Sequence, residues 1–238
     1  MNICKLKSVI LYKMIHLEKK IIYLHIPKTG GASVETVLLS LGFVLLKDTG
    51  FVKANYVDEL VENTSQYNTE KLKSIPYEDQ NNHIPLFMWK VYLERHGYDL
   101  KDFKIFATVR DPYKLVISGM NFYKKLNYRP ILIDFSKSHS DNIKKFIDIP
   151  LYHFDWMCFD GVSVNDNVHI VFTENISEQL YPYLSQFFEC NPSTSNVWIN
   201  RTKKVDYTDY YRQDKDLEPL VSCHFKYEID RFGFEKPN

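Results

Sequence analysis

Hydrophobic and polar positions alternate in blocks along the chain and predict strands separated by helices. Short apolar runs bounded by polar residues have the length and composition of buried parallel strands. Longer segments with apolar residues three and four positions apart are typical of amphipathic helices. Residues 20–25, 103–109 and 168–173 are the predicted strands, and 33–41, 84–96, 112–125, 142–147, 176–188 and 217–232 are the predicted helices. This alternation predicts an α/β, P-loop-like three-layer domain with a central, mostly parallel sheet.

The length of 238 residues suits one α/β domain. We therefore expect a single domain over residues 1–238, with residues 1–19 as an N-terminal extension before the first strand. Residues 47–82 and 126–160 are polar or irregular, and we expect loops and short helices there.

Composition narrows the partners and cofactors. Lys and Arg number 30 and so do Asp and Glu, so there is no net basic field, and we expect no nucleic acid partner. The four cysteines are scattered without zinc-ligand spacing, and we expect no metal. The apolar run 8–12 is too short to span a bilayer and lacks a small-residue cleavage site. These features predict no stable membrane span and a cytoplasmic location.

The turn between the first strand and the first helix has the composition of an anion-binding loop. Two adjacent glycines let the backbone fold closely around an anion, and a following helix start adds N–H groups and a positive dipole end. Thr and Ser hydroxyls and a Lys ammonium could add further contacts. The predicted loop residues are Pro27, Lys28, Thr29, Gly30, Gly31, Ala32 and Ser33.

This turn is not a Walker A loop. That motif places Lys directly after its last glycine, whereas Lys28 precedes both glycines here. The alternative interpretation is a plain strand-to-helix turn with a solvent-exposed Lys28.

A second candidate phosphate site follows the second strand. Arg110 stands at the carboxyl end of that strand, where open α/β sheets bind ligands, and its planar fork suits phosphate. Asp111 and Pro112 predict a helix start, and Ser118 lies about two turns further on. The alternative is a capped helix in which Arg110 pairs with a carboxylate and Ser118 is packed.

Both segments resemble motifs of the carbohydrate sulfotransferases related to heparan sulfate 2-O- and 6-O-sulfotransferases and their bacterial relatives. Residues 25–33, HIPKTGGAS, are similar to the family's 5′-phosphosulfate loop. Residues 110–118, RDPYKLVIS, are similar to its 3′-phosphate motif. Weaker similarities extend the resemblance from about residue 20 to residue 235.

The resemblance implies a sulfotransferase that takes its sulfuryl group from 3′-phosphoadenosine-5′-phosphosulfate (PAPS). The acceptor would be a hydroxyl, of a carbohydrate or alternatively of a small natural product, and we expect residues 47–82 and 126–160 to shape the acceptor side of the site. His83, between the two motifs, would be the catalytic base, and Lys28 would stabilise the leaving phosphate. Glu174 is a lesser candidate for orienting groups in the site, and we expect His25 to be a packed residue rather than the base.

One position departs from the family pattern. The family's usual second Arg is Leu115 here, with Lys114 beside it, and Lys lacks the planar fork of Arg. Arg201 or Lys203 could supply the missing contact to the 3′-phosphate. Two rival functions remain open from sequence, namely a P-loop kinase or NTPase and a non-catalytic nucleotide- or glycan-binding member.

Overall fold

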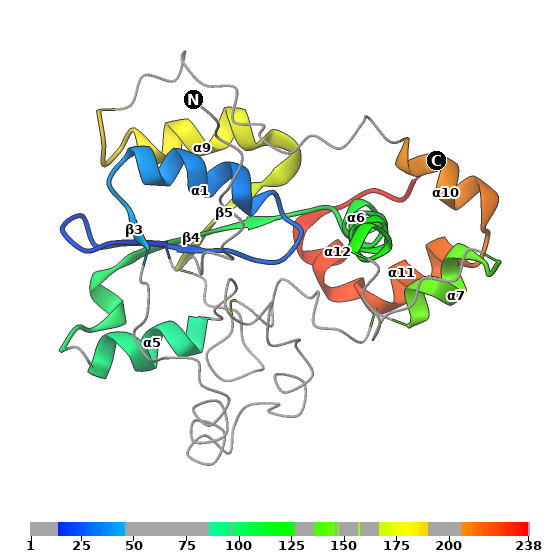
Figure 1. The fold of residues 1–238 in the computed structure, drawn as a ribbon, viewed down its shortest axis with the longest axis horizontal. Coiled ribbons are helices and arrows are strands. Elements are labelled where there is room, and N and C mark those ends of the chain that lie inside the picture. The colour runs from blue at the N-terminus through cyan, green and yellow to red at the C-terminus, as the bar shows by residue number, and fades with distance from the viewer. Residues whose placement is uncertain are drawn as a thin grey trace.

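A five-stranded sheet in the order β3-β1-β2-β4-β5 forms the centre of the computed structural model (Figure 1). Strand β2 pairs in parallel with β4, and β4 in parallel with β5, whereas β1 is antiparallel to both of its neighbours. Four strands therefore point the same way, which confirms the predicted mostly parallel sheet. The strands are β1 (Met14–His16), β2 (Ile21–Leu24), β3 (Val44–Leu45), β4 (Lys104–Val109) and β5 (Val168–Phe172). The structure describes residues 14–45, 86–95, 97–126, 136–145, 147, 157, 167–189 and 206–237.

The edge strand β3 and its neighbour β1 were not predicted. Strand β1 has three residues and β3 has two, which is too short for a periodic pattern to identify them. The assignment of residues 1–19 to an extension is wrong in part, because Met14–His16 pairs with β2 inside the sheet.

Helices cover both faces of the sheet, as predicted. Ile22 and Leu24 of β2 pack in one apolar cluster with Leu86 and Trp89 of α5 (Leu86–Arg95). The alternate residues Ile21 and Tyr23 pack on the other face, with α1 (Gly31–Ser40) and α9 (Ile176–Leu184). This alternation gives the three layers visible in Figure 1.

A second, helical core lies beyond the carboxyl ends of the parallel strands (Figure 1). It is built around α6 (Pro112–Leu126), which begins and ends close to its predicted bounds. The predicted helix 217–232 is two helices, because Phe225 leaves helical geometry with φ −103° and ψ 22°. The surrounding helices are α7 (His139–Lys144), α10 (Tyr207–Gln213), α11 (Leu217–His224) and α12 (Lys226–Phe232).

Two 3₁₀ turns complete the fold, η1 (Leu100–Asp102) before β4 and η2 (Thr173–Asn175) between β5 and α9. Residues 47–82 and most of 126–160 lie outside the described residues, so their placement at the acceptor side stays a prediction. Across the part of the chain that is described, no helix combines the length and hydropathy needed to cross a bilayer.

Candidate functional site

The predicted anion-binding loop joins β2 to α1 in a left-handed turn. Lys28 has φ 65° and Gly30 has φ 82°, and a positive φ is costly for a residue with a side chain such as Lys28. Gly30 occupies the N-cap position of α1, and no side chain caps the helix there. The start of α1 can therefore direct its positive dipole end and its backbone N–H groups toward a bound anion.

The Thr29 side chain is not available to that anion. Thr29 is fully buried, and its hydroxyl donates to the Ile26 carbonyl at 2.8 Å. Because the single hydrogen of the Thr29 hydroxyl is used in this bond, the Thr29 oxygen accepts from the Thr108 hydroxyl, 2.7 Å away. The Thr108 oxygen in turn accepts from the Tyr23 hydroxyl at 2.8 Å. The expectation that the Thr29 hydroxyl contacts the ligand is wrong, because that hydroxyl belongs to a buried chain that anchors the loop to β2 and β4.

Thr173 fixes the loop from the opposite side. Its hydroxyl lies 2.7 Å from the Thr29 carbonyl and 2.8 Å from the Val109 carbonyl, so its hydrogen bonds join the loop to the end of β4. Its methyl group would lie 3.4 Å from a Cβ atom at Gly30, which is ordinary contact. Buried hydroxyls thus connect the carboxyl ends of β2, β4 and β5.

Arg110 brings the two predicted phosphate sites together. Its guanidinium donates from Nη1 to the Lys28 carbonyl at 3.1 Å and from Nη2 to the Tyr207 hydroxyl at 2.8 Å. The guanidinium carbon also lies 5.6 Å from the centre of the Tyr207 ring. The segments around residues 28 and 110 are therefore in direct contact, as expected for adjacent parallel strands.

The second strand-to-helix turn differs from the first in its cap. Asp111 accepts a hydrogen bond from the Tyr113 backbone N–H at 2.9 Å and so occupies the start of α6 with its own carboxylate. Lys114 lies 3.2 Å from Asp111 and 3.9 Å from Glu174. Leu115, where the family pattern has Arg, is fully buried in the helical core and faces no ligand space.

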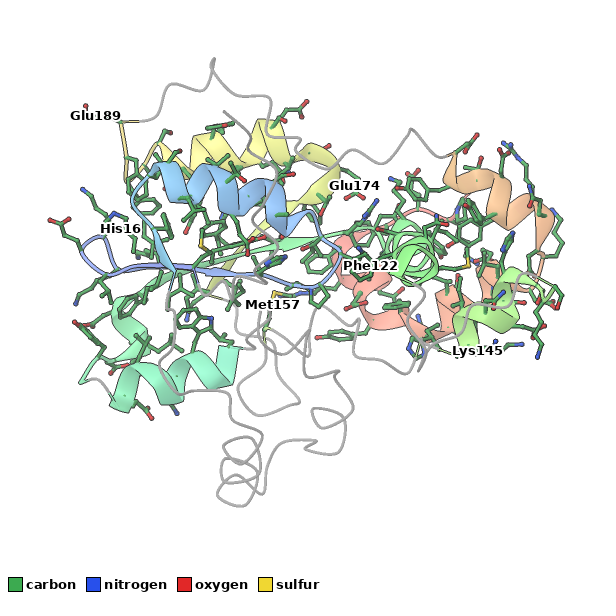
Figure 2. The ribbon with its side chains drawn as sticks, viewed as in Figure 1. His16, Phe122, Lys145, Met157, Glu174 and Glu189 are labelled. Carbon is green, nitrogen blue, oxygen red and sulfur yellow. The ribbon has the colours of Figure 1, made fainter. Side chains whose placement is uncertain are left out.

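Ser118 lies on α6 between two residues that face the loop region. Lys114, Ser118 and Phe122 are spaced four residues apart along α6, and residues at this spacing lie on one face of a helix. The Lys28 ammonium lies 3.7 Å from the centre of the Phe122 ring, so this face meets the loop. Figure 2 shows Phe122 and Glu174 at the same end of the sheet. Ser118 is half-buried there, and its contact with a phosphate stays a prediction.

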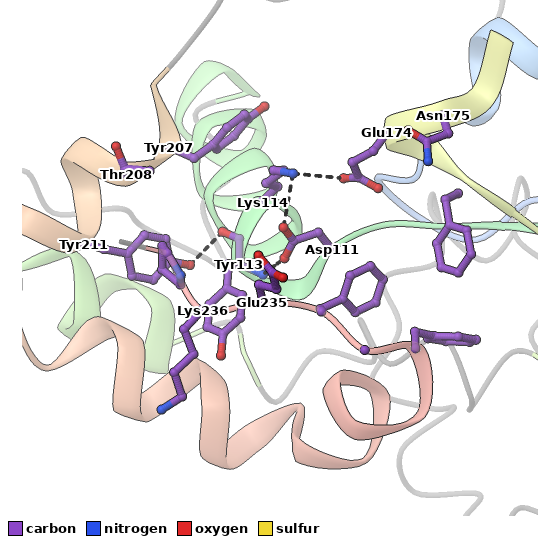
Figure 3. Close-up of a pocket in the computed structure, with 15 residues that line it drawn as sticks. Asp111, Tyr113, Lys114, Glu174, Asn175, Tyr207, Thr208, Tyr211, Glu235 and Lys236 are labelled. Carbon is purple, nitrogen blue, oxygen red and sulfur yellow. Dashed lines mark hydrogen bonds and ion pairs between the residues drawn. The ribbon is translucent and has the colours of Figure 1, made fainter. Parts of the chain in front are cut away.

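A pocket of about 460 Å³ opens beside Arg110 and its partner Tyr207 (Figure 3). It combines aromatic walls with charged groups of both signs. Its lining includes Asp111, Tyr113, Lys114, Phe172, Glu174, Tyr207, Tyr211, Phe232, Phe234, Glu235 and Lys236. A flat, polar-edged ring system matches such a lining better than a simple apolar ligand.

The electrostatics of this pocket centre on Glu174. Burial raises the pKa of the Glu174 carboxyl above its ordinary value, and the nearby Lys114 ammonium partly opposes that rise. Lys114 thus pairs with two carboxylates, one after β4 and one after β5.

Some predicted site residues cannot be located from the structure. His83, Arg201 and Lys203 lie outside the described residues. Ala32 is exposed in the first turn of α1, Pro27 is half-buried and Ser33 is buried. Within the described ranges, no group of three or more His, Cys, Asp or Glu side chains could hold a metal ion.

A family model described as "Sulfotransferase family" matches residues 13–158, which include both candidate phosphate segments. The chain belongs to the sulfotransferase family. Membership confirms the expectation of a sulfotransferase that uses PAPS, and it sets aside the kinase or NTPase alternative.

Other known proteins add little to this assignment. No curated protein matches the sulfotransferase sequence. The crystal structure of mouse sulfotransferase SULT7A1 complexed with PAP is similar at 15% identity and a TM-score of 0.49, over 98% of this chain and 95% of that chain. No argument rests on a likeness of that degree.

Sequence reasoning missed several residues that build this sulfotransferase's site. Thr108 and Thr173 stand at the ends of β4 and β5, where polar residues after an apolar run could have indicated them. Tyr207 and Glu35 carried no local signal. His25 was expected to be packed, and it is, with its Nδ1 2.6 Å from the Glu35 carboxylate.

Proposed function

We propose that this chain transfers the sulfuryl group of PAPS to a hydroxyl of a carbohydrate acceptor. The observation that carries the proposal is the contact between the two phosphate segments, in which Arg110 bonds the Lys28 carbonyl beside the uncapped start of α1. PAPS carries a 5′-phosphosulfate and a separate 3′-phosphate on the same ribose, so it requires two neighbouring anion sites separated by one sugar.

The loop would hold the 5′-phosphosulfate and the second segment the 3′-phosphate. Backbone N–H groups at the start of α1 and the Lys28 ammonium would face the 5′ group. Arg110 and the Ser118 hydroxyl would contact the 3′-phosphate, with Arg201 and Lys203 as further candidates. The ribose would lie between the two groups, and the aromatic pocket beside Tyr207 would receive the adenine.

The chemistry is an in-line displacement at sulfur. The acceptor oxygen forms a bond to sulfur as the bond from sulfur to the bridging 5′-phosphate oxygen breaks, and negative charge develops on the departing phosphate. Lys28 and the loop amides stabilise that charge, and alignment of the two substrates supplies the rest of the rate enhancement. The acceptor proton passes to a general base, for which we propose His83.

The nucleotide preference tests the donor assignment. The product nucleotide 3′-phosphoadenosine-5′-phosphate (PAP) should raise the melting temperature more than AMP or ATP does at equal concentration. Equal or greater protection by ATP would overturn the assignment of a 3′-phosphate site.

Turnover tests the base and the acceptor. In a sulfation assay with labelled PAPS, His83→Ala should abolish transfer while PAP binding persists. Retained transfer would remove His83 from the mechanism. A panel of carbohydrate and small-molecule hydroxyl acceptors in the same assay decides between a carbohydrate and a small natural product.

A further inference from the structure

The imidazole of His25 lies directly against the first residue of α1. A Cβ atom built on Gly31 would lie 1.8 Å from His25 Nε2 and 2.0 Å from Cδ2. No side chain fits in that space, so the ring edge occupies the volume that any other residue at position 31 would need.

This contact explains the second glycine of the loop. Gly30 has a left-handed φ of 82°, which accounts for glycine there. Gly31 has no positive φ and begins a regular helix, so its backbone conformation does not require glycine. Position 31 requires glycine because the His25 ring lies too close to the backbone there for any side chain to fit.

The ring of His25 is held on its other sides. Nδ1 lies 2.6 Å from Glu35 Oε1, and the two side chains are only 14% and 8% exposed. Glu35 lies one helical turn after Gly31, so the imidazole spans the first turn of α1 along one face. The ring also stacks on Tyr23, with centroids 5.9 Å apart and planes 19° from parallel, and Tyr23 is anchored through its hydroxyl to Thr108.

We propose that His25 is a positioning residue for the phosphosulfate loop. Glu35 and Tyr23 fix the imidazole, and its distal edge supports Gly31, so that the first turn of α1 presents its N–H groups to the 5′ group of the donor. The proposal rests on the proposed function for its ligand. It assigns His25 no part in proton transfer, and its effect is confined to the 5′ end of the nucleotide.

The test separates positioning from simple packing with His25→Asn. The Asn amide can still donate to Glu35, but it lacks the distal ring edge at Gly31. Calorimetric dissociation constants should be measured for PAP and for adenosine 3′-monophosphate, which lacks the 5′-phosphate. We expect PAP to bind about tenfold more weakly to the variant, a change of about 1.4 kcal/mol, and adenosine 3′-monophosphate to bind unchanged. Unchanged PAP binding, or an equal loss for both nucleotides, would overturn the proposal.

A second substitution tests the contact itself. Gly31→Ala should weaken PAP binding and lower the melting temperature strongly in the wild-type background, and much less when His25→Asn has removed the ring edge. If Gly31→Ala lowered PAP affinity and the melting temperature equally in both backgrounds, the His25 ring would not be what requires glycine at position 31. If wild-type protein fails to bind PAP at all, the proposed function fails, whereas the four melting temperatures still report the contact between His25 and Gly31.

Discussion

The sheet contains two neighbouring strand-to-helix turns that are built in opposite ways. After β2, the chain turns through Lys28 and Gly30 in left-handed conformations, and α1 starts without a side-chain cap. After β4, Asp111 caps α6 with its carboxylate, and the charged side chains Arg110 and Lys114 surround that start.

Under the proposed function, this difference would give each turn a different kind of anion site. An uncapped helix start binds an anion through backbone groups, which suits a group whose charge grows during the reaction and needs donors fixed in advance. A helix start that already carries a carboxylate repels a second anion, so a phosphate there must be held by side chains. The first turn thus suits the reacting 5′ group and the second suits the 3′-phosphate that does not react.

The largest expected effect is on the rate at the first turn. Lys28→Met should lower kcat by about two to three orders of magnitude, because it removes a positive charge near the leaving phosphate and keeps the aliphatic stem. Single-turnover assays with saturating PAPS measure this. Lys226→Met, which removes an exposed lysine of α12 paired with Asp230, is the matched control and should leave kcat unchanged. A Lys28→Met defect confined to the KM for PAPS would contradict the comparison.

At the second turn the expected effect is on affinity. Arg110→Lys should weaken PAP binding by about 10- to 100-fold, because a single ammonium nitrogen lacks the planar fork with which Nη1 and Nη2 reach the Lys28 carbonyl and the Tyr207 hydroxyl at once. Calorimetry measures the loss, and kcat at saturating PAPS should change far less than in Lys28→Met. The control is Arg212→Lys, an exposed arginine of α10 paired with Asp209. A variant with wild-type affinity for PAP would remove Arg110 from the phosphate site.

The hydroxyl chain beneath the first turn should matter for stability. Thr29→Val keeps the side-chain shape but leaves Thr108 without the acceptor for its buried hydrogen, which costs about 1–3 kcal/mol. Thermal denaturation should show a fall of about 2–10 °C. Thr36→Val removes an exposed hydroxyl of α1 that bonds the Ala32 carbonyl, and it should change the melting temperature by about 1–2 °C at most. Equal effects of the two variants would mean that the buried chain does not stabilise the loop.

The smallest expected effect is a pH dependence at the second turn. The pKa of Glu174 is raised in the folded state by burial, so the folded protein retains this proton more strongly than the unfolded chain does. The contribution of Glu174 to stability is therefore full below the ordinary carboxyl pKa and is lost as pH rises through the raised pKa of the folded state. Gln does not titrate, so Glu174→Gln removes this loss of stability at higher pH. The melting temperature of the variant, taken relative to that of wild type at the same pH, should therefore rise by about 1–3 °C between pH 4 and pH 7. A difference that falls over this range would contradict the assigned direction.

Much of the fold was predictable because its signals are local. The apolar runs of β2, β4 and β5 and the Asp111–Pro112 start of α6 can each be recognised within ten residues. Strand β1 and the break at Phe225 were missed, because a three-residue strand has no periodicity and the break interrupts an otherwise continuous helical pattern. The prediction of phosphate sites at the loop and at Arg110 rested on glycine spacing and on the position of Arg110 after an apolar run.

The sequence by itself thus predicted the order of the longer elements, a candidate anion-binding turn and the family, all of which depend on residues close together in the chain. Only the tertiary structure decided which side chains the turn uses. Thr29 meets Thr108 across 79 positions, Arg110 reaches the Lys28 carbonyl across 82, and Thr173 reaches the Thr29 carbonyl across 144. The reason is physical: parallel strand ends converge in space while their residues stay far apart in sequence. The direction of each hydroxyl, and the ring that fills the space beside Gly31, are therefore set by packing alone.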